Sequence, residues 1–320
     1  MSAEKIPPMP LLLWVPDDLR FRLIERVLKP VTPVRRSPGL PTAQRLRECS
    51  LVVVDLADVG PAGFARLTEV LRSEKTGCRP VVLARGKSPE TWRHLLAPGL
   101  VSNILAHDMP LATRELFTTV RKLLGPDIFG LDKYFAAGTK PVEWSLTHSD
   151  RLGSVLEEVD AYVKTLSIHP RLSTQMVSVA DEFLTNGLYN APVDETGLHL
   201  YRALPRGAPV ELPPERALRV LLMCDGETLG LSVEDRYGSL HGDTVVDYLS
   251  KCFASGGAQV EYKAGGAGLG FYCVFEWLNQ FAINILPRHR TEMIGLMTIS
   301  GSYKTFLASN KSFNLFVSSP

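Results

Sequence analysis

One stretch of the chain reads Val177-Ser-Val-Ala-Asp-Glu-Phe-Leu-Thr-Asn-Gly-Leu-Tyr-Asn-Ala191 and carries two helical patterns at once. In it and just before it, apolar residues recur at the spacing of one helix face: Leu172, Met176, Val179 and Phe183. Polar residues recur four apart along another edge: Ser178, Glu182, Asn186 and Asn190. Such an edge can hold a hard cation through oxygen and position a water. A solvated helix face with a polar C-terminal end is the alternative, and the segments that follow decide between the two.

Two later segments supply matching chemistry. Residues 229–233 read as a strand, and the carboxylate of Asp235 follows it beside a turn at Gly238. A carboxylate in that place can accept a hydrogen bond from an exocyclic amine. Further on, Gly265-Gly-Ala-Gly-Leu-Gly270 directly precedes an apolar helix predicted at residues 271–278. Glycines there let backbone N–H groups approach phosphate oxygens, and the helix N-terminus favours negative charge.

Taken alone, the glycine-rich run fits neither the G-x-G-x-x-G nor the P-loop pattern and indicates only a flexible loop that starts a helix. In this order, however, the three segments resemble the N, G1 and G2 boxes of the GHKL ATPase family, and are most similar to its anti-sigma-factor serine kinase branch. The resemblance covers residues 142–318. It implies a GHKL α/β sandwich, a mixed sheet with helices on one face, that binds ATP and Mg²⁺.

The resemblance assigns a role to individual positions. It implies that Asn186 binds Mg²⁺, that Glu182 is the general base or a water-mediated metal contact, and that Asp235 takes the adenine amine. The remaining ATP-binding positions that it implies are Asn190, Gly238, Gly266, Gly268, Gly270 and Thr291. One departure concerns the G1 box, Asp-x-Gly-x-Gly in the family, where Tyr237 replaces the first glycine. We expect this tyrosine to narrow the adenine pocket, which favours ATP binding over turnover.

The elements predicted for this second domain, residues 142–320, are of the α+β kind. Helices are predicted at 151–166 and 171–191, and strands at 142–147, 198–203, 218–223, 229–233, 282–286, 292–298 and 313–317. Cys224-Asp-Gly-Glu227 is typical of a hairpin turn between two of these strands. Antiparallel-looking strands with helices grouped between them indicate a sheet that is covered on one face.

The first 125 residues alternate strand-like apolar runs with helix-like stretches. Strands are predicted at 11–15, 50–55, 80–84 and 101–106, and helices at 18–28, 64–71 and 111–124. This alternation predicts an α/β domain with a parallel, doubly wound sheet. Residues 126–141 contain several glycines and prolines and are predicted to be a linker with one short helix.

This first domain resembles a flavodoxin-like response-regulator receiver. Asp55 ends a strand where receivers carry the phosphorylated aspartate, so it is the candidate phosphoacceptor. Ala84 stands where a receiver uses Thr or Ser, and residues 106–110 contain no lysine before the proline. Phosphoryl transfer needs cations around the equatorial oxygens. We therefore expect a pseudo-receiver used for protein contact rather than a phosphorylated one.

Composition limits the function classes. The net charge of +1 predicts no broad attraction to nucleic acid or membranes. The five cysteines are scattered without a C-x-x-C pair, which fits a reducing cytoplasm, and no apolar run reaches membrane-spanning length. We expect a bacterial cytoplasmic signalling protein that binds ATP and regulates a partner protein, as a serine/threonine kinase or an ATPase-like switch. The alternative is a non-catalytic scaffold with degenerate pockets. The resemblance also implies homodimers, because related domains dimerise.

Overall fold

The computed structural model describes residues 9–86, 88–96, 99, 101–107, 113–254 and 267–318. The chain divides into two compact units, Met1–Gly125 and Pro126–Pro320. Both are built of strands and helices, so the predicted α/β class is confirmed. No helix in the described ranges combines the length and the apolar character needed to cross a membrane.

The first unit contains a parallel sheet with the strand order β2-β1-β3-β4-β5. Its strands are β1 (Leu11–Trp14), β2 (Val34–Arg36), β3 (Leu51–Asp55), β4 (Arg79–Ala84) and β5 (Asn103–Ala106). All five residues of β3 are buried, as expected for a strand covered on both faces. The sequence prediction missed β2, a three-residue strand with two arginines, because it is not an apolar run.

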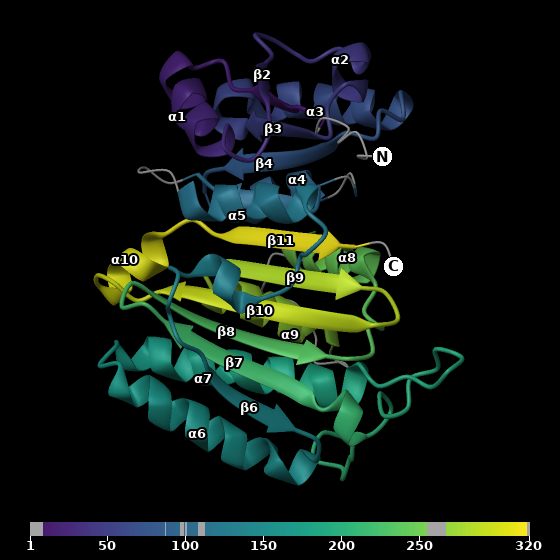
Figure 1. The fold of residues 1–320 in the computed structure, drawn as a ribbon, viewed down its shortest axis with the longest axis vertical. Coiled ribbons are helices and arrows are strands. Elements are labelled where there is room, and N and C mark those ends of the chain that lie inside the picture. Colours follow the sequence, from purple (N-terminus) through teal and green to yellow (C-terminus); the bar gives the residue numbers. More distant parts are fainter. Residues whose placement is uncertain are drawn as a thin grey trace, which may run out of the picture. The chain divides into compact units, whose positions relative to one another are not determined.

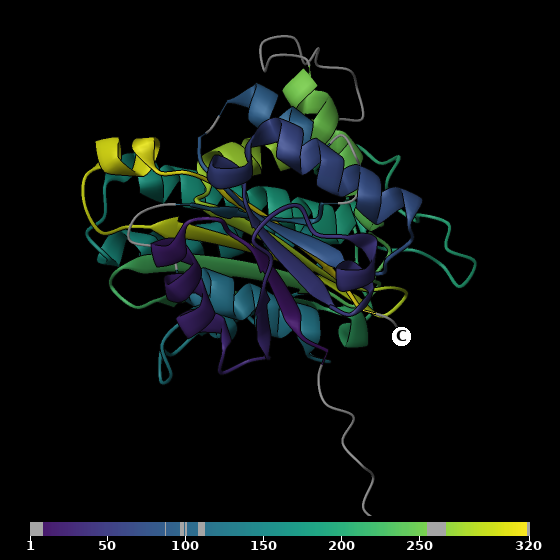
Figure 2. The ribbon, with the colours of Figure 1, turned by 90° about the horizontal axis from the view of Figure 1, so that it is seen from above.

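Helices cover both faces of this sheet. They are α1 (Asp18–Leu28), α2 (Ala43–Arg47), α3 (Leu56–Ser73), α4 (Pro89–Leu96) and α5 (Thr113–Leu124). Successive side chains of a strand point to opposite faces, so Leu11 and Leu13 pack with α1 and α5, whereas Leu12 and Trp14 pack with α2 and α3. Figure 2 shows α1 and α3 on opposite sides of the sheet.

The second unit contains a mixed sheet with the order β11-β9-β10-β8-β7-β6 (Figure 1). Strands β9 and β11 are parallel, and the other neighbours are antiparallel. The strands are β6 (Val142–Leu146), β7 (Leu218–Cys224), β8 (Thr228–Asp235), β9 (Gln280–Leu286), β10 (Arg290–Thr298) and β11 (Ser312–Val317). The predicted hairpin between β7 and β8 is confirmed, with Gly226 in its turn at φ 88°.

The helices of this unit are α6 (Leu152–Thr165), α7 (Pro170–Thr185), α8 (Gly242–Ala254), α9 (Ala267–Trp277) and α10 (Tyr303–Ala308). Short turns of helix are η1 (Leu131–Tyr134), η2 (Ser149–Arg151), η3 (Asn186–Asn190) and η4 (Pro214–Arg216). Helix α7 packs on the sheet through the predicted apolar face, with Phe183 stacked 5.8 Å from Phe281 of β9. Gly295 of β10 lets Leu278, and Val179 of α7, lie against the strand, since a β-carbon there would come 2.9 Å from Leu278 and 3.3 Å from Val179.

The segment predicted as a linker is packed rather than exposed. Residues 126–135, which we call the 126–135 segment, lie on the sheet face opposite α7, in front of the strands in Figure 1. Phe135 packs against Gly230 of β8, where a side chain would come within 2.8 Å of its ring. The backbone N–H of Gly130 donates to Glu292 Oε2 at 2.8 Å. Helices therefore cover one face of the sheet, as predicted, and this segment covers part of the other.

The strand predicted at residues 198–203 is wrong. These residues belong to an irregular loop between η3 and β7, which we call the 192–210 segment. Their one strand-like hydrogen-bond pairing is an isolated β-bridge between Val193 and His199. Leu198 and Leu200 are 69% and 49% exposed. The alternation of apolar residues is present, but among the described residues this stretch pairs with no strand, and its leucines stay exposed.

Candidate functional site

A cleft opens in the second unit where α7 ends, bounded by β8, β10, α8 and α9. Its unfilled space, including the part open to solvent, is about 670 Å³. Four residues that the sequence analysis named line it together: Asn186, Asn190, Asp235 and Thr291. They come from three elements far apart in the chain, so the fold assembles them.

Local structure at the end of α7 fixes the two amides. The helix widens into the single π-helical turn η3, a distortion that is frequent at functional sites. Asn186 Nδ2 donates to the backbone oxygen of Glu182 at 2.8 Å, and Asn190 Nδ2 donates to Asn186 Oδ1 at 2.8 Å. These two bonds orient both amides, and among the described residues Asn186 Oδ1 accepts only the one from Asn190.

The carboxylate of Asp235 lies at the end of β8, with the residue only 5% exposed. The backbone N–H groups of Tyr237 and Gly238 both donate to its Oδ1, at 2.8 and 3.1 Å. Burial raises the pKa of Asp235 to about 6, although these N–H groups and the nearby Thr291 act in the opposite direction. A buried carboxylate with this pKa is costly to keep charged, which is typical of a binding or catalytic site.

Thr291 of β10 lies directly across the strand pair from Asp235. Its Oγ1 is buried and lies near enough to the Asp235 carboxylate to lower the pKa of that group, although the two groups do not meet with standard hydrogen-bond geometry. Buried hydroxyls are normally satisfied, because an unmade hydrogen bond costs about 1–3 kcal/mol. A polar ligand at this place would offer the Thr291 hydroxyl a better-aligned hydrogen bond than the Asp235 carboxylate does.

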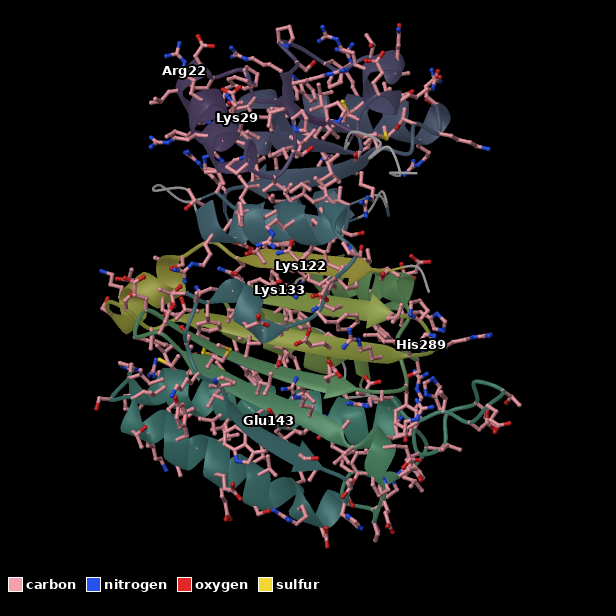
Figure 3. The ribbon with its side chains drawn as sticks, viewed as in Figure 1. Arg22, Lys29, Lys122, Lys133, Glu143 and His289 are labelled. Atoms are coloured by element: carbon pink, nitrogen blue, oxygen red, sulfur yellow. The ribbon has the colours of Figure 1, made fainter. Side chains whose placement is uncertain are left out.

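The two G1-box positions after Asp235 lie outside the cleft lining. Gly238, at φ 58°, packs against the backbone of Leu286, His289 and Arg290 at the β9–β10 turn, where Figure 3 labels His289. It thus holds the turn that supplies N–H groups to Asp235. Tyr237 does not narrow the cleft, contrary to our expectation, because its ring packs under the guanidinium of Arg216, 5.1 Å from the ring centre.

Glu182 and Gly270 are not among the described residues that line the cleft. Glu182 Oε1 accepts a hydrogen bond from Arg206 of the 192–210 segment at 2.9 Å. Helix α9 begins at Ala267, earlier than predicted, so Gly268 and Gly270 are helical, and Gly266 lies outside the described residues. Gly270 packs against the Glu182 carboxylate so closely that a β-carbon would collide with Oε2.

Sequence reasoning missed three basic residues that line the cleft: His199, Arg202 and His241. His199 and Arg202 belong to the 192–210 segment, where a strand had been predicted. The only signal available was their position shortly after the polar helix edge. The conformation of an irregular segment depends on tertiary contacts, so the sequence does not show which of its side chains face inward.

Comparisons with known proteins leave the chain without an assigned family. No protein-family model and no curated protein matches it. One solved structure, a pilus assembly-related protein of Burkholderia pseudomallei, is similar at 20% identity over 37% of this chain and 90% of that one, with a TM-score of 0.31. Another, a pilus assembly protein of Burkholderia thailandensis, is similar at 19% identity over 36% and 97%, also with a TM-score of 0.31. Likeness at this level does not extend to function.

In the first unit, the candidate phosphoacceptor Asp55 is fully buried and has structural partners on both oxygens. Oδ1 accepts the backbone N–H of Ala57 at 3.0 Å and caps α3, while Oδ2 lies 3.1 Å from Arg20 and 3.2 Å from His107 Nδ1. Burial raises the pKa of Asp55, but His107, the Ala57 N–H and Arg20 together bring it below its usual value.

We expect acetyl phosphate to leave Asp55 unmodified, because Arg20 and His107 cover the oxygen that would have to attack phosphorus. The acidic residues after β1 are also engaged elsewhere, since Asp17 caps α1 and Asp18 pairs with Arg36. Intact-mass measurement after incubation with Mg²⁺ and acetyl phosphate checks this. An adduct that appears in the wild type and is missing in Asp55→Asn would show instead a working receiver.

Proposed function

We propose that the second unit binds ATP with Mg²⁺ in this cleft and that the protein regulates a partner protein in bacterial signalling. One observation carries the proposal. Asp235 and the Thr291 hydroxyl lie side by side on the sheet, and the oriented amides of Asn186 and Asn190 line the same cleft. A ligand that fits needs a hydrogen-bond donor at one end and a cation or polar group at the other, as Mg-ATP has.

The base end of the proposed site is the β8–β10 pair. The exocyclic amine of adenine would donate to Asp235, whose Oδ1 already accepts the backbone N–H groups of Tyr237 and Gly238. The Thr291 hydroxyl would satisfy its hydrogen bond on the same base. The Asp235 carboxylate and the Thr291 hydroxyl are both buried, so removing them from water costs free energy in the unliganded protein. Hydrogen bonds to the base would offset part of that cost.

The metal end is Asn186. In the described part of the chain no three acidic, histidine or cysteine side chains gather as a metal site. Mg²⁺ in nucleotide sites takes one or two protein oxygens and completes its shell with phosphates and waters. A single amide oxygen therefore fits a cation that arrives with the nucleotide, and it does not fit a permanently bound metal.

The contact of Glu182 favours binding over turnover. In a kinase of the anti-sigma-factor type Glu182 would be the general base, and a base must reach the proton that it abstracts. Here Arg206 occupies one of its oxygens at 2.9 Å. We therefore propose nucleotide binding as the primary function. Phosphoryl transfer to a partner's serine or threonine would require Arg206 to leave Glu182, and the non-catalytic scaffold is the alternative.

The first unit is proposed to be a pseudo-receiver that contacts other proteins. Its strand order, β2-β1-β3-β4-β5, is that of flavodoxin-like sheets, which supports this proposal. The engaged carboxylate of Asp55 argues for a contact role rather than a phosphorylated one. Homodimerisation, implied by the resemblance, and a cytoplasmic location, favoured by the scattered cysteines, belong to the same proposal.

Titration calorimetry with ATP and Mg²⁺ tests the site through Asn186→Ala. We expect the affinity to fall about tenfold to 100-fold, the usual cost of losing a charged-group hydrogen bond or metal ligand at a site. Ser178→Ala is the matched control, because Ser178 lies on the same helix edge but is bonded only to Thr174 of its own helix. In EDTA the difference between Asn186→Ala and the wild type should shrink. Wild-type protein that gives no heat with millimolar ATP would favour the scaffold.

A further inference from the structure

The cleft carries more basic than acidic groups. Among the described residues that line it, Asp235 is the one carboxylate, whereas Arg202, His199 and His241 are basic. Asp235 is already engaged at Oδ1 by two backbone N–H groups. The excess of basic groups predicts that the part of the ligand away from Asp235 is anionic.

His199 has an unmet hydrogen bond inside the cleft. Its Nδ1 is buried and has no partner among the residues that the structure describes. The bridge to Val193 holds its backbone, and Leu198 and Leu200 on either side are exposed, so the imidazole is the inward side chain of this stretch. A buried ring nitrogen without a partner indicates a donor or acceptor that the protein does not supply.

Arg202 is exposed to solvent and presents a positive charge at the same cleft. It lines the cleft, and no described residue forms an ion pair or hydrogen bond with it. Its neighbour Arg206, four residues on, is by contrast paired with Glu182 at 2.9 Å. A guanidinium has a planar set of donors that matches phosphate oxygens, which makes arginine a preferred residue for phosphate recognition.

The 192–210 segment is anchored to the helix end that carries the amides. Tyr189 of η3 donates its hydroxyl to the backbone oxygen of Ala208 at 2.9 Å and accepts the N–H of Gly207 at 3.2 Å. Ser149 Oγ accepts the N–H of Val210 at 2.8 Å. The base of the segment is thus held against the elements that form the cleft, which reduces the reorganisation needed when a ligand binds.

We propose that the 192–210 segment recognises the phosphates of the bound nucleotide, with Arg202 and His199 contacting phosphate oxygens. The inference rests on the proposed function, since it names the group that this segment recognises in the same site. The segment then makes the cleft selective for nucleoside triphosphates and diphosphates over nucleosides. The same segment carries Arg206, whose guanidinium donates a hydrogen bond to Glu182. The segment that contacts the phosphates therefore also engages Glu182.

The test is a calorimetric series with ATP, ADP, AMP and adenosine on the whole chain with Mg²⁺. The wild type should bind them in falling order. Arg202→Gln should lose about tenfold or more in ATP affinity and about twofold or less in adenosine affinity, because a charged hydrogen bond is lost only with the phosphates. His199→Gln should act the same way more weakly. Leu198→Ser is the control, since that side chain is 69% exposed on the same segment.

The outcomes separate the two proposals. If the wild type binds ATP and both variants keep its ratio of ATP to adenosine affinity, the phosphate role of the segment is wrong while nucleotide binding stands. If the wild type binds none of the four ligands, the proposed function fails and the inference fails with it. Thermal midpoints measured without ligand, expected to match the wild type, exclude misfolding as the cause of a loss.

Discussion

Replacing Asp235 with asparagine is expected to lower ATP affinity about 100-fold or more. In the proposed site the carboxylate accepts a hydrogen bond from the adenine amine, whereas the asparagine NH₂ would set one donor against another. The backbone N–H groups of Tyr237 and Gly238 bind Oδ1 at 2.8 and 3.1 Å, and they would hold the amide oxygen of the variant in the same place. The amide NH₂ then replaces Oδ2, and it faces the exocyclic amine of the adenine. Calorimetry with Mg-ATP measures the loss.

The same variant should be more stable than the wild type at neutral and alkaline pH. The pKa of Asp235 is raised from 3.8 to about 6, so the folded protein favours the protonated acid more than the unfolded chain does. The stability that this group contributes is therefore complete below pH 3.8 and is lost as the pH rises through about 6. The shift corresponds to about 3 kcal/mol at most. Asparagine carries no charge to bury and escapes this loss.

Thermal midpoints of wild type and Asp235→Asn between pH 4 and pH 8 check this pH dependence. We expect the two proteins to be similar near pH 4 and the variant to have the higher midpoint near pH 8, with the difference developing around the raised pKa of about 6. Adding Mg-ATP should raise the midpoint of the wild type alone. A constant difference at every pH would show that Asp235 is not the buried titrating group described above.

Gly238→Ala is expected to destabilise the second unit by about 4 kcal/mol. The positive φ strains an alanine at this position, and its β-carbon would in addition collide with backbone atoms of the β9–β10 turn. Gly238 has φ 58°, and a β-carbon there would lie 2.6 Å from the N of His289 and 2.7 Å from the N of Arg290, and would collide with the oxygen of Leu286. None of these atoms belongs to a flexible side chain that could turn away. The β9–β10 turn would have to move, and with it the N–H group of Gly238 that binds Asp235.

Gly226→Ala is the matched control for this prediction. Gly226 also has a positive φ, 88°, but a β-carbon there would meet nothing within 4 Å. It should cost about 1–2 kcal/mol, the strain alone. Urea unfolding followed by circular dichroism compares the two variants. Equal losses would mean that the contacts at the β9–β10 turn contribute nothing to the effect, and that conformational strain accounts for all of it.

Much of the candidate site could be named before the fold was known, and one part of it could not. Asn186 and Asn190 follow from a spacing of four within one helix, and Asp235 from its place at a strand end. The resemblance to the GHKL boxes then added Thr291, which the structure places opposite Asp235. His199 and Arg202 escaped, because an irregular segment has no periodicity from which inward and outward side chains can be told apart.

Local pattern was enough for the most regular elements, although it missed β2 and α8 and gave a strand at 198–203 that does not form. Continuous apolar runs predicted the buried strands, a helical spacing predicted α7, and the Asp-Gly turn predicted the β7–β8 hairpin, since each of these depends on neighbours a few residues away. Long-range packing settled the rest. The ion pairs of Arg206 with Glu182 and of Arg20 with Asp55 join residues 24 and 35 positions apart. The placing of the 126–135 segment on the back of the sheet likewise depends on surfaces that exist only once the strands have paired. No local propensity encodes such contacts, because they form between elements and not within them.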